Sequence, residues 1–295
     1  MTIRRFKIIT VLTLGILSFF AIPSAMADPA PDANSVLILE DTDVFGSYST
    51  EAAAQGFTVV LVSDAEWATY SESDFASFRA IIIGDPNCVG GTAYLAPVNG
   101  NKADWSAAIG GGASSNPKLI IGTDENFHRT QGGSQLISSG IQFVTSTPGQ
   151  TGLYFSFGCA YHGATPNTPV PELDELGAFG AGEADGCFDD AHIVATHPAL
   201  AGTTDDSLSN WSCSVHNVFN SAPDSFVPLA IANGQSGEGS EEFRDGSMGI
   251  PYIYASGAGV SAVGEEVPVP TLSWWMMMLL VASLGSYGLY RLRRN

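Results

Sequence analysis

Residues 36–43 read VLILEDTD: four aliphatic residues in a row, followed at once by a stretch with three carboxylates. A short run of aliphatic residues that ends at polar residues is typical of a strand buried on both faces of a parallel sheet. The same pattern returns along the chain, with polar segments long enough for a helix between the runs. The stretch therefore predicts one strand of an α/β fold in which strands and helices alternate.

The predicted strands are runs of three to six residues rich in Val, Ile and aromatic side chains. They lie at 36–39, 57–62, 80–83, 119–121, 153–157, 192–195, 227–232 and 252–255. The predicted helices between the first four strands lie at 48–55, 71–78 and 104–109. This alternation implies a doubly wound, mostly parallel sheet with right-handed crossovers, which we place at 35–260.

Carboxylates follow the predicted strands at the edge where open α/β folds bind ligands. If they converge, they are candidates for a Ca²⁺ or Mg²⁺ site, because these ions take oxygen ligands. The candidate ligands are Asp41, Asp43, Asp85 and Asp124. The competing interpretation is helix capping: residues 63–66 and 71–74 both have the pattern of a capping box, and Asp is an ordinary N-cap residue.

The order of elements, with a helix, glycines and a strand over 105–121 followed by Gly-Thr-Asp, resembles the class I glutamine amidotransferase-like fold. This resemblance implies a flavodoxin-like domain that is an enzyme in some proteins and a noncatalytic module in others. In the enzymes, a cysteine follows a strand in a G-x-C-x-G turn, and a His-x-Glu comes later. Here the candidates are Cys159, within FGCAYHG at 157–163, and His216.

Two departures from that pattern favour a noncatalytic domain. The glycine that precedes Cys159 is adjacent to it, and the next glycine comes four residues later. His216 is followed by Asn217 and Val218, so the sequence supplies no Glu to orient it. A catalytic base needs such a partner, and Cys159 and His216 are therefore an alternative catalytic pair rather than the preferred interpretation.

The four cysteines predict two disulfides, because the protein is expected to be exported. They are Cys88, Cys159, Cys187 and Cys213. Three pairings are possible, and we favour Cys88 with Cys159 and Cys187 with Cys213, since the first two both follow predicted strands. The alternative is zinc, because Cys159 with His162 and Cys213 with His216 share a C-x-x-H spacing.

The charge is sparse and one-sided. The chain has 295 residues and a formal net charge of −19. Away from the two ends, all 30 acidic residues face a small basic set, which consists of Arg79, Lys102, Lys118, Arg129 and Arg244. Such a surface repels polyanions, so we expect no nucleic-acid partner.

The N-terminus predicts export. A basic start, RRFK at 4–7, precedes an apolar run at 8–21 and the small-residue site Ser-Ala-Met-Ala at 24–27. This is the layout of a signal peptide, so signal peptidase is an expected partner and the mature chain is expected to begin at Asp28. Residues 28–34 form a short leader.

The C-terminus predicts a membrane helix. Residues 272–290 carry no charge, Trp274 and Trp275 suit a membrane interface, and the basic tail RLRRN follows at 291–295. A helix of this length, about 28 Å, spans a bilayer core. The basic tail places the body outside the cytoplasm. Residues 261–268 form a linker.

The last residues, 269–295, also resemble an IPTL-CTERM sorting signal of bacterial surface proteins. The motif comprises Val269, Pro270, Thr271, Leu272 and Ser273. The resemblance implies an exosortase-like membrane enzyme as partner, cleavage near this motif, and release or transfer to the cell surface. From the sequence we expect an exported surface protein with a noncatalytic α/β domain; the alternative is an extracellular hydrolase or amidotransferase-like enzyme, in one version metal-assisted.

Overall fold

The computed structural model describes residues 33–88, 92–112 and 114–257. The predicted signal peptide (1–27), most of the leader, the linker (261–268) and the sorting signal with its membrane helix lie outside the described residues. Within the described ranges, no helix has both the length and the apolar character needed to cross a bilayer.

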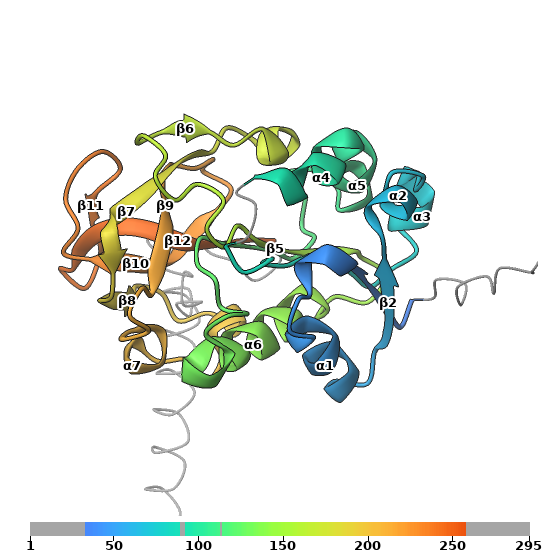
Figure 1. The fold of residues 1–295 in the computed structure, drawn as a ribbon, viewed down its shortest axis with the longest axis horizontal. Coiled ribbons are helices and arrows are strands. Elements are labelled where there is room, and N and C mark those ends of the chain that lie inside the picture. The colour runs from blue at the N-terminus through green and yellow to red at the C-terminus, as the bar shows by residue number, and fades with distance from the viewer. Residues whose placement is uncertain (1–32, 89–91, 113, 258–295) are drawn as a thin grey trace, which may run out of the picture. The chain divides into compact units, whose positions relative to one another are not determined.

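Five parallel strands form one half of a nine-stranded sheet (Figure 1). Their order in the sheet is β2-β1-β3-β5-β4. They are β1 (Ser35–Leu39), β2 (Thr58–Val62), β3 (Ala80–Ile83), β4 (Lys118–Ile121) and β5 (Gly152–Ser156). All residues of β1, β3, β4 and β5 are buried, as the aliphatic runs predicted. Because the strands are parallel, their carboxyl ends share one edge.

The other half of this sheet is antiparallel. It consists of β12 (Met248–Ser256) beside β4, then β10 (Val227–Asn233) and β8 (Ala191–Ile193), with β11 (Glu241–Glu242) paired to β12. A second sheet has the order β6-β7-β9. Its strands are β6 (Thr168–Pro169), β7 (Gly180–Phe188) and β9 (Val215–Ser221). Strand β9 packs against β12, which brings the second sheet to the large one.

Helices cover both faces of the parallel half. In Figure 1, α1 (Ser47–Ala54) and α6 (Ser134–Val144) lie on one side of the sheet. The opposite side carries α2 (Asp64–Trp67), α3 (Glu72–Phe75), α4 (Ala96–Gly100) and α5 (Lys102–Ala108). The remaining α-helix, α7 (Asp205–Leu208), lies near β8. Short 3-10 turns occupy Glu40–Thr42, Ala93–Leu95, Pro171–Leu176 and Pro198–Leu200, and a π-turn occupies Arg129–Gly133.

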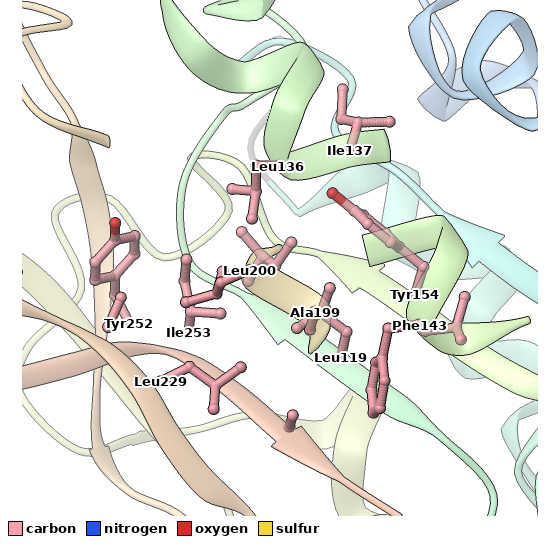
Figure 2. Close-up of a cluster of buried hydrophobic side chains, with 14 of the residues drawn as sticks. Leu119, Leu136, Ile137, Phe143, Tyr154, Ala199, Leu200, Leu229, Tyr252 and Ile253 are labelled. Carbon is pink, nitrogen blue, oxygen red and sulfur yellow. The ribbon is translucent and has the colours of Figure 1, made fainter. Parts of the chain in front are cut away.

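The alternation of strand side chains divides the interior into two cores. Val36 and Ile38 of β1 face the core under α1 and α6, whereas Leu37 and Leu39 face the core under α2 to α5. Figure 2 shows part of the first core, where side chains of α6 meet those of β4, β10 and β12. Burying each such aliphatic side chain stabilises the fold by roughly 1.5–3 kcal/mol.

The eight predicted strands all form, with small shifts at their ends. The expected helix at 71–78 is shorter: the capping box of Ser71 and Asp74 begins α3 at Glu72, and the helix ends at Phe75. The related pattern at 63–66 is half a box, in which only Ser63 accepts a hydrogen bond from the Glu66 amide. The sequence reading missed α6 and the strands β7 and β9, which carry few consecutive aliphatic residues.

We predict that Gly140→Ala destabilises the fold. A Cβ at Gly140 of α6 would lie 2.5 Å from Tyr154 Cε2 and 2.7 Å from Leu119 Cδ2. Overpacking costs about 1–3 kcal/mol and exceeds the gain of up to ~1 kcal/mol from replacing a helical glycine. Urea unfolding should show the loss. The control Gln142→Ala, at an exposed position of the same helix, should stay within about 0.5 kcal/mol of wild type. A Gly140→Ala protein more stable than wild type would contradict this packing.

Candidate functional site

Four side chains meet at the carboxyl edge of the parallel strands. Cys88 follows β3, Asp124 follows β4, Cys159 follows β5, and His216 comes from β9 of the second sheet. One ligand atom from each of the four lies within 4.8 Å of the other three. Within the residues that the structure describes, no other group of three or more Cys, His, Asp or Glu side chains is so close.

A tight turn after β5 presents Cys159. Gly158 has φ +47°, a left-handed conformation that favours glycine. A Cβ at Gly158 would also overlap Asp85 Oδ1, so the position needs glycine for space as well. The amide of Ala160, directly after the cysteine, donates a hydrogen bond of 2.7 Å to the Phe157 carbonyl and closes the turn.

His216 joins the cysteine to a carboxylate. Its Nδ1 lies 3.0 Å from Cys159 Sγ, and its Nε2 lies 3.0 Å from Asp124 Oδ1. The expectation that His216 has no acidic partner is wrong. The partner is Asp124, which is distant in sequence but arrives from the end of β4, whereas the chain after His216 supplies none. The three side chains therefore have the order of a nucleophile, a base and an orienting acid.

Asn217, next to His216, fastens β9 to the edge of the large sheet. Its amide donates to the Gly122 carbonyl over 2.8 Å, and its Oδ1 accepts a hydrogen bond from the Tyr161 amide over 2.9 Å. Its Nδ2 donates to the Gly158 carbonyl. Asn217 thus ties together the end of β4, the cysteine turn and the histidine strand. The sequence pattern gave Asn217 no role, because it occupies the unspecified middle position of His-x-Glu.

The structure confirms the predicted disulfide between Cys88 and Cys159, whose Cα atoms are 4.8 Å apart. Cys213 is disulfide-bonded as well, and its Sγ lies 3.7 Å from His216 Nδ1. The side chain of Cys187 lies outside the described residues, so the second predicted pairing stays a prediction. Among the described cysteines none is free, and Cys88 is the exposed member of its pair.

The two C-x-x-H pairs do not form the zinc site that their spacing suggested. His162 lies outside the four-residue cluster, and its Nε2 faces Glu183 Oε1 at 3.5 Å. Cys213 is held in a disulfide. One residue of each pair, Cys159 and His216, belongs to the four-residue cluster, where the other two members are Cys88 and Asp124.

The four acidic candidates have different positions and roles. Asp41 is exposed, and Asp43 caps α1 by accepting hydrogen bonds from the amides of Tyr48 and Ser49. Asp85 is buried and accepts hydrogen bonds from the amides of Asn87 and Cys88. Only Asp124 belongs to the four-residue cluster.

Asp85 therefore shapes the turn that carries Cys88. Asn87 and Cys88 both have positive φ, 66° and 52°, which is costly for residues other than glycine. The carboxylate that accepts their amide hydrogen bonds holds this conformation. Burial, followed by the nearby Glu125 and Asp124, raises the pKa of Asp85 well above its usual range.

Glu125 lies beneath the site in a buried polar network. Its Oε1 accepts hydrogen bonds from Tyr48 (2.9 Å) and Tyr154 (2.7 Å), and its Oε2 accepts one from Ser156 (2.9 Å). Burial raises the pKa of Glu125 to about 7, against the lowering effect of these hydrogen bonds. Glu125 was not among the acidic candidates from the sequence, although it directly follows Asp124.

We predict that Glu125→Gln flattens the dependence of stability on pH. The folded-state pKa of Glu125 is raised from 4.5 to about 7, so the folded state holds this proton more tightly than the unfolded state. Its contribution is therefore fully present below about pH 4.5 and is lost as the pH rises to about 7. Between about pH 5 and pH 7.5, wild type should lose roughly 2 kcal/mol more unfolding free energy than Glu125→Gln.

Urea unfolding across that pH range measures the difference. The exposed Glu242 offers a matched control, since Glu242→Gln should follow the wild-type pH profile. Asp85, whose pKa is also raised, leaves a residual slope of the same sign in Glu125→Gln. Parallel profiles for wild type and Glu125→Gln would show that Glu125 is not the titrating group.

Comparison with known proteins leaves the site to be interpreted from its own chemistry. No protein-family model matches the chain, and neither a curated protein sequence nor a solved structure does so.

Proposed function

We propose that the described domain is a latent thiol enzyme of the acyl-transfer class, a hydrolase or amidotransferase-like enzyme that works outside the cytoplasm. The observation that carries the proposal is the contact series from Cys159 Sγ to His216 Nδ1 and from His216 Nε2 to Asp124 Oδ1, each 3.0 Å. A cysteine beside a base that is itself oriented by a third group is the arrangement of an activated nucleophile.

The fold supports this proposal. The cysteine follows a central parallel strand, at the edge where open α/β sheets bind ligands, and helices cover both faces of that sheet. This arrangement favours the flavodoxin-like, class I glutamine amidotransferase-like fold that the sequence suggested. In the enzymes of that fold the cysteine also follows a strand, although their turn reads G-x-C-x-G and here Gly158 directly precedes Cys159.

The reaction requires the disulfide to be opened first. A thiol reductant supplies two electrons and two protons, and Cys88 and Cys159 become thiols. His216 Nδ1 then takes the Cys159 proton, and the thiolate attacks the carbonyl carbon of an ester or amide. The leaving group departs with the proton from His216, which leaves a thioester on Cys159. Water, deprotonated by His216, hydrolyses the thioester and restores the thiol.

Two features keep the oxidised domain at rest. The sulfur of Cys159 is bonded to Cys88 and cannot attack. The Ala160 amide is also engaged with the Phe157 carbonyl, so it does not point to a developing oxyanion. Because reduction of the disulfide does not free the Ala160 amide, we expect the activity of the reduced protein to be modest.

The second candidate function is a noncatalytic surface domain, which the sequence favoured. The observation in its favour is that the described cysteines are disulfide-bonded and none of them is free. Both candidates share the proposed route: export by a signal peptide, membrane anchoring through 272–290 and sorting by an exosortase-like enzyme at 269–273. They differ in whether Cys159 ever acts as a thiolate.

We predict that Cys88→Ser exposes a working nucleophile. With p-nitrophenyl acetate, Cys88→Ser should release p-nitrophenol over several turnovers and show an acetyl thioester on Cys159 by mass spectrometry. Adding His216→Gln should slow turnover by about 10²-fold or more, since a general base contributes that much. Oxidised wild type should be inactive and should gain activity on reduction.

Cys88→Ser/Cys159→Ala is the background control and should show no turnover. Cys88→Ser/His162→Gln is the matched control, because His162 is a nearby histidine outside the cluster, and it should keep activity near that of Cys88→Ser. A folded Cys88→Ser protein without turnover, or one that is unaffected by His216→Gln, would favour the noncatalytic candidate.

The proposed route predicts that the chain is cleaved at two places, once near each end. The exported, mature protein should begin at Asp28 and end within 269–273, and the intact mass of the surface form from the native host measures both ends at once. A mass that retains the chain through Asn295 would mean that 269–295 acts only as a membrane anchor.

A further inference from the structure

We infer that the reduced form of this site is a zinc site, with Cys88, Cys159, His216 and Asp124 as its four ligands. The inference concerns the same side chains as the proposed activity but does not require that activity. The site is described here in its oxidised state, and the zinc ion belongs to the state in which both sulfurs are free thiols.

The size of the cluster fits a tetrahedral ion. The four ligand atoms already lie within 4.8 Å of one another. Zinc takes thiolates at about 2.3 Å and imidazole nitrogen at about 2.0–2.1 Å, so neighbouring ligand atoms of a tetrahedron are roughly 3.3–3.8 Å apart. When the disulfide opens, the two sulfurs move apart into this range, and the Cα separation of 4.8 Å stays compatible with it.

Two buried polar atoms that lack an aligned hydrogen bond provide a second observation. Asp124 is 2% exposed and His216 is 7% exposed. Asp124 Oδ1 and His216 Nε2 face each other at 3.0 Å, yet neither atom forms an aligned hydrogen bond. The other oxygen, Asp124 Oδ2, lies 3.5 Å from Cys88 Sγ. Asp124 Oδ1 also lies 3.3 Å from His128 Nε2, so only histidine nitrogens face this buried oxygen as ion-pair partners in the described part of the chain. A cation at this point would compensate the cost of burying the carboxylate.

The ligand types select zinc over the ions considered from the sequence. Ca²⁺ and Mg²⁺ take oxygen ligands, and this cluster offers two sulfurs, one imidazole and one carboxylate. Thiolate and imidazole together suit zinc. His216 can give Nδ1, the nitrogen that lies 3.0 Å from Cys159 Sγ, to the ion.

The surrounding residues hold the ligands in place without the ion. Asp85 accepts hydrogen bonds from the amides at the Cys88 turn, and Asn217 fastens the strand of His216 to the Cys159 turn. The site is therefore supported by neighbours that remain when the disulfide is reduced. Such support lowers the cost of ordering the ligands on binding.

Oxidation state decides whether the ion binds. Two thiols, or one phosphine together with one water molecule, deliver two electrons and two protons to the disulfide, and zinc then displaces the two thiol protons. In the oxidised state the sulfurs are bonded to each other and are poor ligands. Bound zinc would hold the Cys159 thiolate and inhibit the proposed acyl transfer, so the ion and an acyl substrate compete for the same sulfur.

The test is zinc binding by the folded protein before and after anaerobic reduction with a trialkylphosphine, which is then removed. Competition with a chromophoric chelator gives the affinity, and Co²⁺ in place of zinc gives the thiolate-to-cobalt absorption of the bound sulfurs. We expect one ion per reduced chain and none at this site in the oxidised chain. Cys88→Ala and Asp124→Asn should each weaken binding at least about 10-fold.

Two matched controls separate this site from other sulfurs and acids. Cys213→Ala removes a sulfur outside the four-ligand set, and Asp41→Asn removes an exposed carboxylate at the same sheet edge; both should bind zinc as wild type does. If Cys88→Ala does not fold, Cys159→Ser gives the same comparison at the other sulfur. Far-UV circular dichroism establishes folding for each variant.

The inference is overturned if the reduced protein binds no zinc, or if Cys213→Ala loses the ion while Cys88→Ala keeps it. The outcome is separate from that of the proposed function. Ester turnover by a reduced protein that binds no zinc would keep the activity and reject the metal site. Zinc binding by a reduced protein that shows no ester turnover would keep the metal site and reject the proposed activity.

Discussion

The joining of β9 to the carboxyl edge of the parallel sheet is the constraint on which the site depends. A cysteine after β5 has little chemistry alone, and the histidine that faces it comes from a different sheet. Asn217 joins the two by bonding to the Gly122 and Gly158 carbonyls and to the Tyr161 amide. Gly122 allows this approach, because a Cβ there would overlap the carbonyl of Asn217. The same contact positions His216 against both Cys159 and Asp124.

The buried acids beneath the site give it an unusual electrostatic setting. Glu125 and Asp85 are both buried, and desolvation raises the pKa of each. Asp124 adds a third carboxyl at the same edge, and its ion-pair contacts in the described part of the chain are with two histidines, His128 and His216. A cation or a protonated histidine is therefore the natural counterpart of this edge. The proposed histidine base and the inferred zinc ion both follow from this balance of charge.

Local sequence was enough to predict the parallel half of the large sheet and one disulfide, but not that β8, β10, β11 and β12 pair antiparallel. The aliphatic runs fixed the buried strands, and the position of Cys88 and Cys159 after two strands suggested their pairing; β3 and β5 are in fact neighbours. Helix α6 was missed because serines and a glycine interrupt its apolar face. The acid beside His216 could not be predicted from the His-x-Glu pattern, which concerns only the residues directly after the histidine. Asp124 reaches it through the topology of two sheets, which no local pattern encodes.

The measurement that tests the central claim most directly is the rate at which iodoacetamide alkylates Cys159 in Cys88→Ser, compared with Cys88→Ser/His216→Gln, at one neutral pH and in the absence of metal. If His216 activates the sulfur as its 3.0 Å contact implies, the rate should fall by about 10-fold or more when His216 is changed, because the thiolate is the reacting form. Equal rates in two folded variants would contradict the account, since Cys159 would then be an ordinary thiol and its disulfide a structural one.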